Sequence, residues 1–296
     1  SAVDKDLASR DGERLLVYVP AYPKMKRTVS GGEVFVDGRP LAETALARDP
    51  VRPAPRGDIL ALLKAGCAAE VCLARDEGEL SALLGAASSG SILVCDGNTD
   101  AALEATAEAL ASAGRDLLLA GTGGFAGLWA RRLGLPRDAP PPATPRVRRC
   151  LIAAGSMHPA SREQVHTAQA AGLPVCYLDA QPDRDVAVLL TTGDWACLAT
   201  SGDSRPGVSS RIGVIAGEAC RARSFDALVV FGGSTAVAIL GALGVAEVRA
   251  IGELLPGIPT SLVRWQDRDI LLVTKAGGFG EPDTLIRIRR LLEEQN

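Results

Sequence analysis

Long hydrophobic runs are missing from this sequence. No apolar stretch reaches the roughly 18 residues that a membrane-spanning helix requires, and the N-terminus lacks the basic start and apolar middle of a secretory signal peptide. We therefore expect a cytoplasmic protein with no membrane partner.

The sequence also lacks an excess of basic residues. Lysine and arginine total 32 against 35 aspartates and glutamates, so the net charge is -3, with both signs scattered along the chain. Because binding to nucleic acid needs a basic face, we expect no nucleic-acid partner. A small anionic ligand needs only a local positive site.

Two familiar motif types are absent. The seven cysteines are dispersed at spacings that do not suit zinc, so we interpret them as reduced core thiols and expect no metal held by protein ligands alone. No Walker A pattern occurs, which excludes the P-loop enzymes but does not exclude ATP.

What the chain does contain is a regular alternation of strand and helix patterns. Its 296 residues, 47% of them hydrophobic, suffice for two compact domains with full cores. In the first half we predict strands at 14–19, 69–73, 91–95 and 116–120, helices at 58–65, 78–86, 101–113 and 125–133, and a hairpin at 32–41. This order predicts the α/β class: two domains, each a mainly parallel sheet flanked by helices.

A proline-rich stretch separates the two halves. Residues 136–147 hold too much proline for a helix or a central strand, so they predict a linker between domains at 1–135 and 148–296. In the second half we predict strands at 150–154, 174–178, 186–190, 227–231 and 269–274, helices at 162–171 and 237–243 and from residue 283 onward, and a long mobile loop at 192–211.

A glycine turn follows the apolar strand at 227–231. Gly232, Gly233, Ser234 and Thr235 combine close backbone approach, hydroxyl groups and the unpaired N–H groups of a new helix, which favours a bound phosphate. Alone, this motif is equally typical of a strand-to-helix turn that merely needs glycine.

The same layout occurs twice more in the second half. Gly155 and Ser156 follow strand 150–154, and Gly277 and Gly278 follow strand 269–274. In an open α/β sheet the ligand crevice lies at the carboxyl ends of the strands, so the three turns predict one nucleotide site. Beside them, His158 either contacts the nucleotide or caps a helix, and Lys275 either pairs with phosphate or faces solvent.

Short motifs follow one another from about residue 20 to the end of the chain. They include Pro20-Ala21-Tyr22-Pro23, Arg27-Thr28, Val94-Cys95-Asp96, Ala120-Gly121-Thr122-Gly123-Gly124, Ala154-Gly155-Ser156, Gly232-Gly233-Ser234-Thr235-Ala236 and Lys275-Ala276-Gly277-Gly278-Phe279-Gly280. This ordered series resembles the four-carbon acid sugar kinase family.

The resemblance implies phosphorylation of a sugar acid of the erythronate, threonate or oxo-tetronate type by ATP with Mg²⁺. It also implies that the first domain binds the sugar acid and the second binds ATP. Arg27 matches the family's Gly-Arg-Thr and is a candidate ligand of the sugar acid, while Lys26 replaces the glycine. Asp203 or Glu253 could hold Mg²⁺ through water.

One departure from the family concerns the N-terminus. Members open with Asp-Asp-x-Thr-Gly-Ala, which is absent here, and residues 1–7 resemble only a remnant of a later Lys-x-Asp-Ser-x-Leu-Arg-Gly segment. We expect residues to be missing upstream and the general base to lie among them. Asp4 and Asp6 are the remaining candidates for a catalytic carboxylate.

Two rival functions stay open. Residues Gly121 to Ala126 fit the G-x-G-x-x-A fingerprint of a dinucleotide-dependent dehydrogenase, although the acidic residue required about 20 positions on would fall in the proline-rich stretch. A nucleotide-binding protein without catalysis is the other rival. The sequence does not fix the sugar acid, the phosphorylated hydroxyl or the oligomeric state, and a homo-oligomer is compatible with it.

Overall fold

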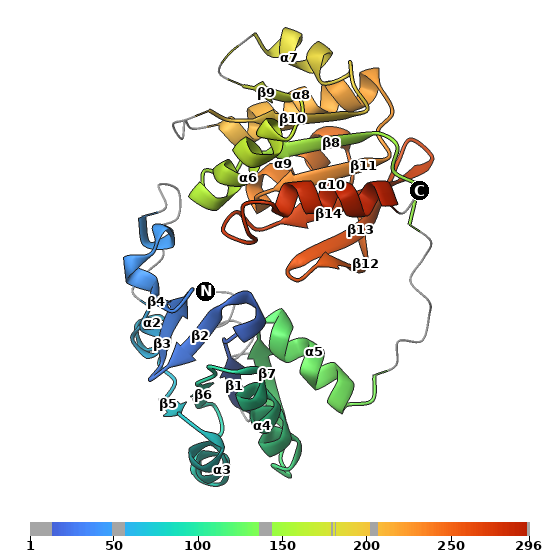
Figure 1. The fold of residues 1–296 in the computed structure, drawn as a ribbon. Coiled ribbons are helices and arrows are strands. Elements are labelled where there is room, and N and C mark those ends of the chain that lie inside the picture. The colour runs from blue at the N-terminus through green and yellow to red at the C-terminus, as the bar shows by residue number, and fades with distance from the viewer. Residues whose placement is uncertain are drawn as a thin grey trace. The chain divides into compact units, whose positions relative to one another are not determined.

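A computed structural model of the chain describes residues 14–48, 57–135, 144–178, 180, 182–201 and 207–294. The chain forms two compact units, Ser1–Asp138 and Ala139–Asn296 (Figure 1). The boundary falls inside the proline-rich stretch, where residues 136–143 lie outside the described part of the chain.

The first unit is built on a parallel four-stranded sheet with the order β5-β6-β1-β7. Its strands and helices are β1 (Leu15–Val19), α2 (Ile59–Gly66), β5 (Val71–Ala74), α3 (Glu77–Ala86), β6 (Ile92–Cys95), α4 (Asp100–Ala111), β7 (Leu117–Gly121) and α5 (Gly123–Arg132). Each forms within two residues of its predicted ends. Asp58, Asp76 and Thr99 cap three of the helices by accepting a hydrogen bond from a first-turn N–H.

A small antiparallel sheet lies between β1 and α2 in the chain. It contains β2 (Arg27–Ser30), β3 (Glu33–Val36) and β4 (Arg39–Pro40), with the 3-10 helices η1 (Pro23–Met25), η2 (Leu41–Glu43) and η3 (Ala45–Arg48) around it. Asp37 and Gly38 have φ values of 54° and 76°, as expected for a tight hairpin turn. Lys26 has φ 53°, a left-handed conformation that favours glycine.

The second unit has a seven-stranded sheet with the order β12-β13-β14-β11-β8-β10-β9. The five strands from β14 to β9 are parallel, and β12 and β13 extend the sheet as an antiparallel edge. The elements in chain order are β8 (Cys150–Ala154), α6 (Pro159–Ala170), β9 (Val175–Tyr177), α7 (Asp183–Leu189), β10 (Trp195–Ala199), α8 (Val208–Ala222), β11 (Ala227–Phe231), α9 (Gly233–Leu243), β12 (Val248–Leu255), β13 (Ile258–Trp265), β14 (Arg268–Lys275) and α10 (Thr284–Glu294).

Helices cover both faces of this sheet (Figure 1). Leu151 and Ala153 of β8 belong to a core that α7, α8 and α9 complete, whereas Cys150, Ile152 and Ala154 belong to a second core with α6 and α10. Because both faces of the central strands are buried, these strands appear in the sequence as unbroken apolar runs. That explains why β8 and β11 have their predicted bounds.

Two predictions in the second unit are wrong. The predicted strand at 186–190 is part of the helix α7, where Pro182 precedes an acidic first turn containing Asp183 and Asp185. A five-residue apolar run cannot by itself separate strand from helix. The predicted loop at 192–211 contains the buried central strand β10 and the start of α8, and only residues 202–206 of it lie outside the described chain.

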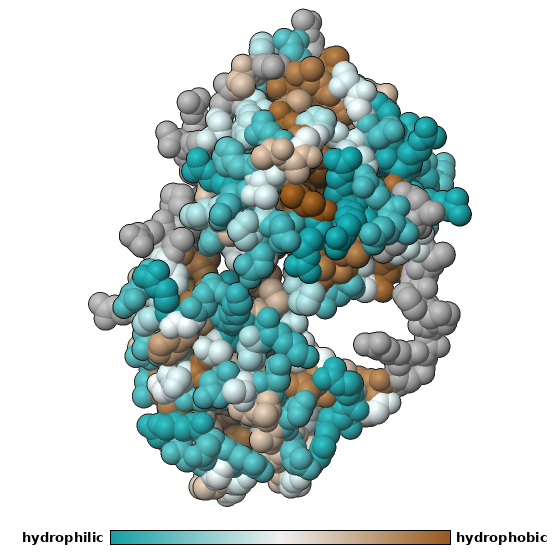
Figure 2. Space-filling view, in the orientation of Figure 1, coloured by the Kyte–Doolittle hydropathy of each residue, from teal (hydrophilic) through white to brown (hydrophobic). Residues whose placement is uncertain are grey.

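The surface is consistent with this distribution of apolar residues. The visible face in Figure 2 is mainly hydrophilic in each unit, with apolar residues confined to small patches. Within the described ranges, none of the helices combines the length and the apolar character needed to cross a membrane.

Candidate functional site

The three glycine turns of the second unit start at the same level of the sheet. Phe231 at the end of β11 is in register with Ala154 at the end of β8 and with Lys275 at the end of β14. The N–H of Gly232 donates to the carbonyl oxygen of Lys275 over 2.9 Å. The turns therefore begin side by side at the carboxyl edge of three neighbouring strands.

At two glycines the turns are so close that a Cβ would fit only if a neighbouring side chain moved. A Cβ added to Gly155 would lie 2.3 Å from Thr235 Oγ1, and one added to Gly277 would lie 2.2 Å from Ser156 Oγ. The structure thus brings Gly155, Ser156, Thr235 and Gly277 into one cluster. Their role as nucleotide ligands stays a prediction.

Two helices begin at this edge of the sheet. Helix α9 starts at Gly233, so the N–H groups of its first turn have no partner within the helix. Gly232 precedes it with φ 101°, a backbone conformation that only glycine adopts readily, while a Cβ at Gly233 would meet nothing within 4 Å. Gly232, and not Gly233, is therefore the position in this turn that favours glycine.

His158 begins the other helix at this edge. Its Nδ1 accepts a hydrogen bond from Ala160 N–H at 3.2 Å, which makes it the N-cap of α6. The ring also lies against the third turn, because a Cβ on Gly278 would be 3.0 Å from His158 Nε2. Of the two roles that the sequence left open, the capping role is present in the structure.

Lys275 is buried, with 2% of its surface exposed, so of the two alternatives that the sequence left open, the solvent-facing one is excluded. Its Nζ donates to the carbonyl oxygens of Ala276 at 2.9 Å and Phe279 at 2.8 Å, and lies 4.4 Å from the centre of the Phe231 ring. Burial lowers the pKa of Lys275 to about 7.

Two further buried side chains contact the same loop. Ser161 Oγ donates to the carbonyl oxygen of Gly277 at 2.7 Å, and Gln164 Nε2 donates to those of Phe279 and Gly280 at 3.0 Å each. Sequence reasoning missed both residues. Their spacing in the sequence could have indicated them, because Ser161 and Gln164 share one helical face with the buried Val165 and Ala168, at positions where apolar residues are expected.

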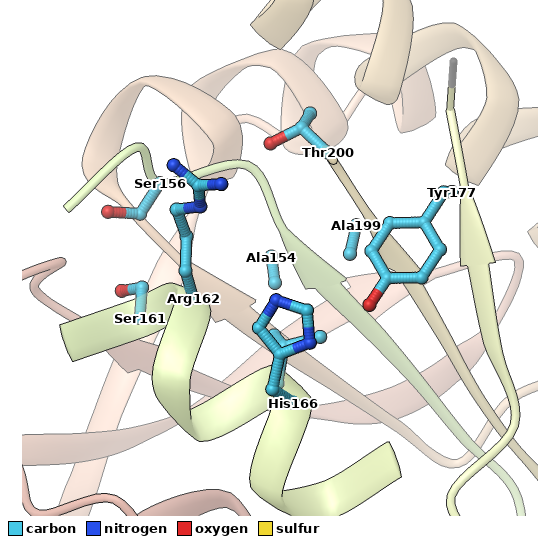
Figure 3. A pocket seen from close by; sticks show the side chains of 9 residues that line it. Ala154, Ser156, Ser161, Arg162, His166, Tyr177, Ala199 and Thr200 are labelled. Carbon is cyan, nitrogen blue, oxygen red and sulfur yellow. The ribbon is translucent and has the colours of Figure 1, made fainter. Parts of the chain in front are cut away.

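A pocket opens on the α6 side of the Gly155 turn. It is lined by Ala154, Ser156, Ser161, Arg162, Val165, His166, Tyr177, Ala199 and Thr200. In Figure 3 the rings of His166 and Tyr177 lie beside each other, while the hydroxyls of Ser156 and Ser161 point away from them. Arg162 contributes a cation to the lining of this pocket.

Arg27, the candidate from the first unit, lies at the start of β2. Its Nη1 donates to the carbonyl oxygen of Met25 at 3.1 Å and lies 3.8 Å from a carboxylate oxygen of Asp37. Burial lowers its pKa, and the Asp37 carboxylate opposes this shift. These contacts give Arg27 a structural role in the hairpin, and its contact with a sugar acid stays a prediction. Asp4 and Asp6 lie outside the described residues.

The carboxyl edge of the first sheet carries two more of the family-like motifs. Asp96 accepts hydrogen bonds from Gly31 N–H at 2.5 Å and Gly32 N–H at 2.9 Å, which ties the β2–β3 turn to the end of β6. Thr122 Oγ1 donates to the carbonyl oxygen of Ala21 at 2.7 Å, which ties the start of α5 to the end of β1.

The dehydrogenase fingerprint does form a strand-turn-helix from β7 to α5. Within the described part of the first unit, however, α5 leads to no further strand, and the next strand in the chain, β8, belongs to the second unit. A dinucleotide site needs an acidic residue at the end of such a strand to bind the ribose. The described part of the first unit therefore lacks the strand end that would carry the acidic residue of a dinucleotide site.

Metal-ligating residues do not cluster in the described part of the chain: no group of three or more His, Cys, Asp or Glu is placed to hold an ion there. Glu253 Oε1 accepts a hydrogen bond from the Gly257 N–H at 2.5 Å, and Asp203 lies outside the described residues.

Known proteins match this chain in both units. Residues 2–128 match a sugar-binding N-terminal domain and residues 196–285 a nucleotide-binding C-terminal domain. A D-threonate kinase of Bordetella bronchiseptica is 30% identical, over 96% of this chain and 72% of that protein. A D-threonate kinase of Salmonella typhimurium is 30% identical, over 95% and 74%. A 3-oxo-tetronate kinase of Cupriavidus necator is 27% identical, over 94% and 71%.

Two crystal structures share the fold. A Salmonella typhimurium protein superimposes with a TM-score of 0.71 at 19% identity, covering 97% of this chain and 75% of its own. A Haemophilus influenzae protein does so with a TM-score of 0.63 at 20% identity, covering 98% and 77%.

The low pKa of Lys275 predicts a pH dependence of stability. Between the folded value of about 7 and the ordinary value of 10.5, the unfolded chain binds a proton that the folded chain does not, so the free energy of unfolding rises with pH. The increase in the free energy of unfolding that comes from Lys275 is fully present above about pH 10.5 and lost below about pH 7. The free energy of unfolding in urea should therefore increase with pH across this range for the wild type relative to Lys275→Met. A difference that is constant or falls with pH would contradict the prediction.

Proposed function

This chain belongs to the four-carbon acid sugar kinase family, and from that premise we propose that it transfers the γ-phosphoryl group of ATP to a hydroxyl of a four-carbon sugar acid. The observation that carries the proposal is the cluster of three glycine turns at one sheet edge. Two of these turns, at Gly232 and Gly277, fall inside the part of the chain that matches a nucleotide-binding domain.

The two units divide the substrates between them in this proposal. The first unit, which matches a sugar-binding domain, takes the sugar acid, and Arg27 is a candidate for holding its carboxylate. The second unit takes ATP at the turns. A domain boundary within residues 136–147 is part of the same proposal.

Catalysis in this proposal consists of positioning and charge stabilisation. Backbone N–H groups at the start of α9 and in the glycine turns would bind phosphate oxygens and neutralise charge on the transferred group. Mg²⁺, when bound, would add positive charge at the phosphates. It is expected to be held mainly by phosphate and water, since such sites use few protein ligands. No step requires a covalent intermediate.

Measurement of ADP release tests this proposal. With ATP and Mg²⁺, the protein should release ADP only when D-threonate, D-erythronate or a 3-oxo-tetronate is present. Nucleotide binding without turnover of any of the three would favour the non-catalytic alternative. Thermal stabilisation by NAD or NADP but not by ATP would instead favour the dehydrogenase.

A substitution at Gly233 tests the second turn. Gly233→Val should weaken ATP binding at least about tenfold, because the side chain would occupy the space that a phosphate needs at the helix N-terminus. The fold should persist, since a Cβ there meets nothing within 4 Å. Gly241→Val, further along the same helix and equally open, is the matched control. Equal calorimetric affinities of Gly233→Val and the control would remove this turn from the site.

A fragment tests the assignment of ATP to the second unit. Residues 147–296 retain every strand of the seven-stranded sheet and all three turns, so the fragment should fold and be stabilised by ATP but bind no sugar acid. Thermal melts with each ligand provide the measurement. A cooperatively melting fragment without ATP stabilisation, beside a full-length protein that shows it, would mean that the first unit contributes to the nucleotide site.

A further inference from the structure

We propose that Lys275, Ser161 and Gln164 are positioning residues, which hold the 276–280 loop so that the N–H groups of Gly277 and Gly278 bind a phosphate of the nucleotide. The inference rests on the proposed function and refines it. It gives the lysine beside the glycine turn an indirect role, in place of the direct pairing with phosphate that its position in the sequence suggests.

The donors of these three side chains account for most carbonyl groups of the loop. Lys275 Nζ contacts the carbonyl oxygens of Ala276 at 2.9 Å, Gly277 at 3.3 Å and Phe279 at 2.8 Å. Ser161 adds a bond to Gly277, and Gln164 adds bonds to Phe279 and Gly280. The loop carbonyls are thus directed toward buried donors on α6 and at the end of β14.

Peptide geometry then fixes the direction of the N–H groups. The chain has no cis peptide bond among its described residues, and a trans peptide places its C=O and its N–H on opposite sides. Since the carbonyls of Ala276 and Gly277 point toward Lys275 and Ser161, the N–H groups of Gly277 and Gly278 point away from them. In the described structure neither N–H has a hydrogen-bond acceptor.

The same two glycines border the neighbouring turn. A Cβ at Gly277 would collide with Ser156 Oγ at 2.2 Å, and one at Gly278 would lie 3.0 Å from His158 Nε2. The free N–H groups therefore belong to the edge where the Gly155 turn and the start of α9 also lie. Two successive N–H groups without acceptors at this edge are available to bind a phosphate oxygen.

Burial supports a function for this arrangement. Lys275, Ser161 and Gln164 are 2%, 1% and 0% exposed, at positions where apolar residues would pack without polar groups to satisfy. The Oε1 of Gln164 is buried and has no donor in the described structure, which is unfavourable. Its Nε2 is the group in use, so Gln164 serves as a donor to the loop.

Three variants of the full-length protein separate an indirect from a direct role. Lys275→Met, Ser161→Ala and Gln164→Met each remove donors to the loop, and Ser210→Ala, an exposed serine on α8, is the control. We expect faster amide hydrogen exchange confined to residues 276–281 in the absence of nucleotide. ATP affinity should fall about tenfold, and KM should rise for ATP but not for the sugar acid.

The outcomes are distinct. If Lys275→Met loses ATP affinity while the exchange of the loop is unchanged, Lys275 contacts phosphate directly and the inference is overturned. ATP affinities equal to that of the control in all three variants also overturn it, and leave the proposed function intact. A wild type that binds neither ATP nor ADP overturns both. Should Lys275→Met fail to fold, Ser161→Ala and Gln164→Met decide the question by the same measurements.

Discussion

The in-register pairing of three parallel strands is the constraint on which the second unit depends. Ala154, Phe231 and Lys275 are partners at the carboxyl ends of β8, β11 and β14, so the segments that follow leave the sheet at one level. This alignment brings the Gly155 and Gly232 turns into contact and places the start of α9 beside them. It also determines the position of the 276–280 loop. A shift of one residue in any of these pairings would invert the faces of the strand and separate the turns.

The elements that the sequence predicts best are those whose bounds are determined by a single physical requirement. Strands β8 and β11 are buried on both faces, so their apolar runs end where burial ends, at Ala154 and Phe231. The glycine turns could be predicted because strand ends and glycines mark them directly. Helix α7 could not, since its apolar residues lie in a run too short to show a period, and β10 was hidden among residues typical of turns.

Lys275 illustrates what a local pattern leaves undetermined. A lysine before a glycine turn is compatible with a phosphate ligand, a solvated side chain or a buried donor, and only the packing of α6 against the loop selects the third. The same holds for Asp96 and Arg27 in the first unit. Their motifs were recognisable, but contacts with the Gly31–Gly32 turn and with Asp37 give them structural roles that sequence reasoning did not assign.

The burial of Lys275 has a chemical consequence beyond the loop. It is the one lysine in residues 139–296, where the other basic side chains are arginine and histidine. An amine whose pKa lies near 7 is largely uncharged in mildly alkaline solution and is then a nucleophile, but acylating reagents reach it only when the loop leaves it. Covalent labelling of this unit by amine-directed reagents is therefore confined to a single side chain, and its rate reports how often the 276–280 loop opens.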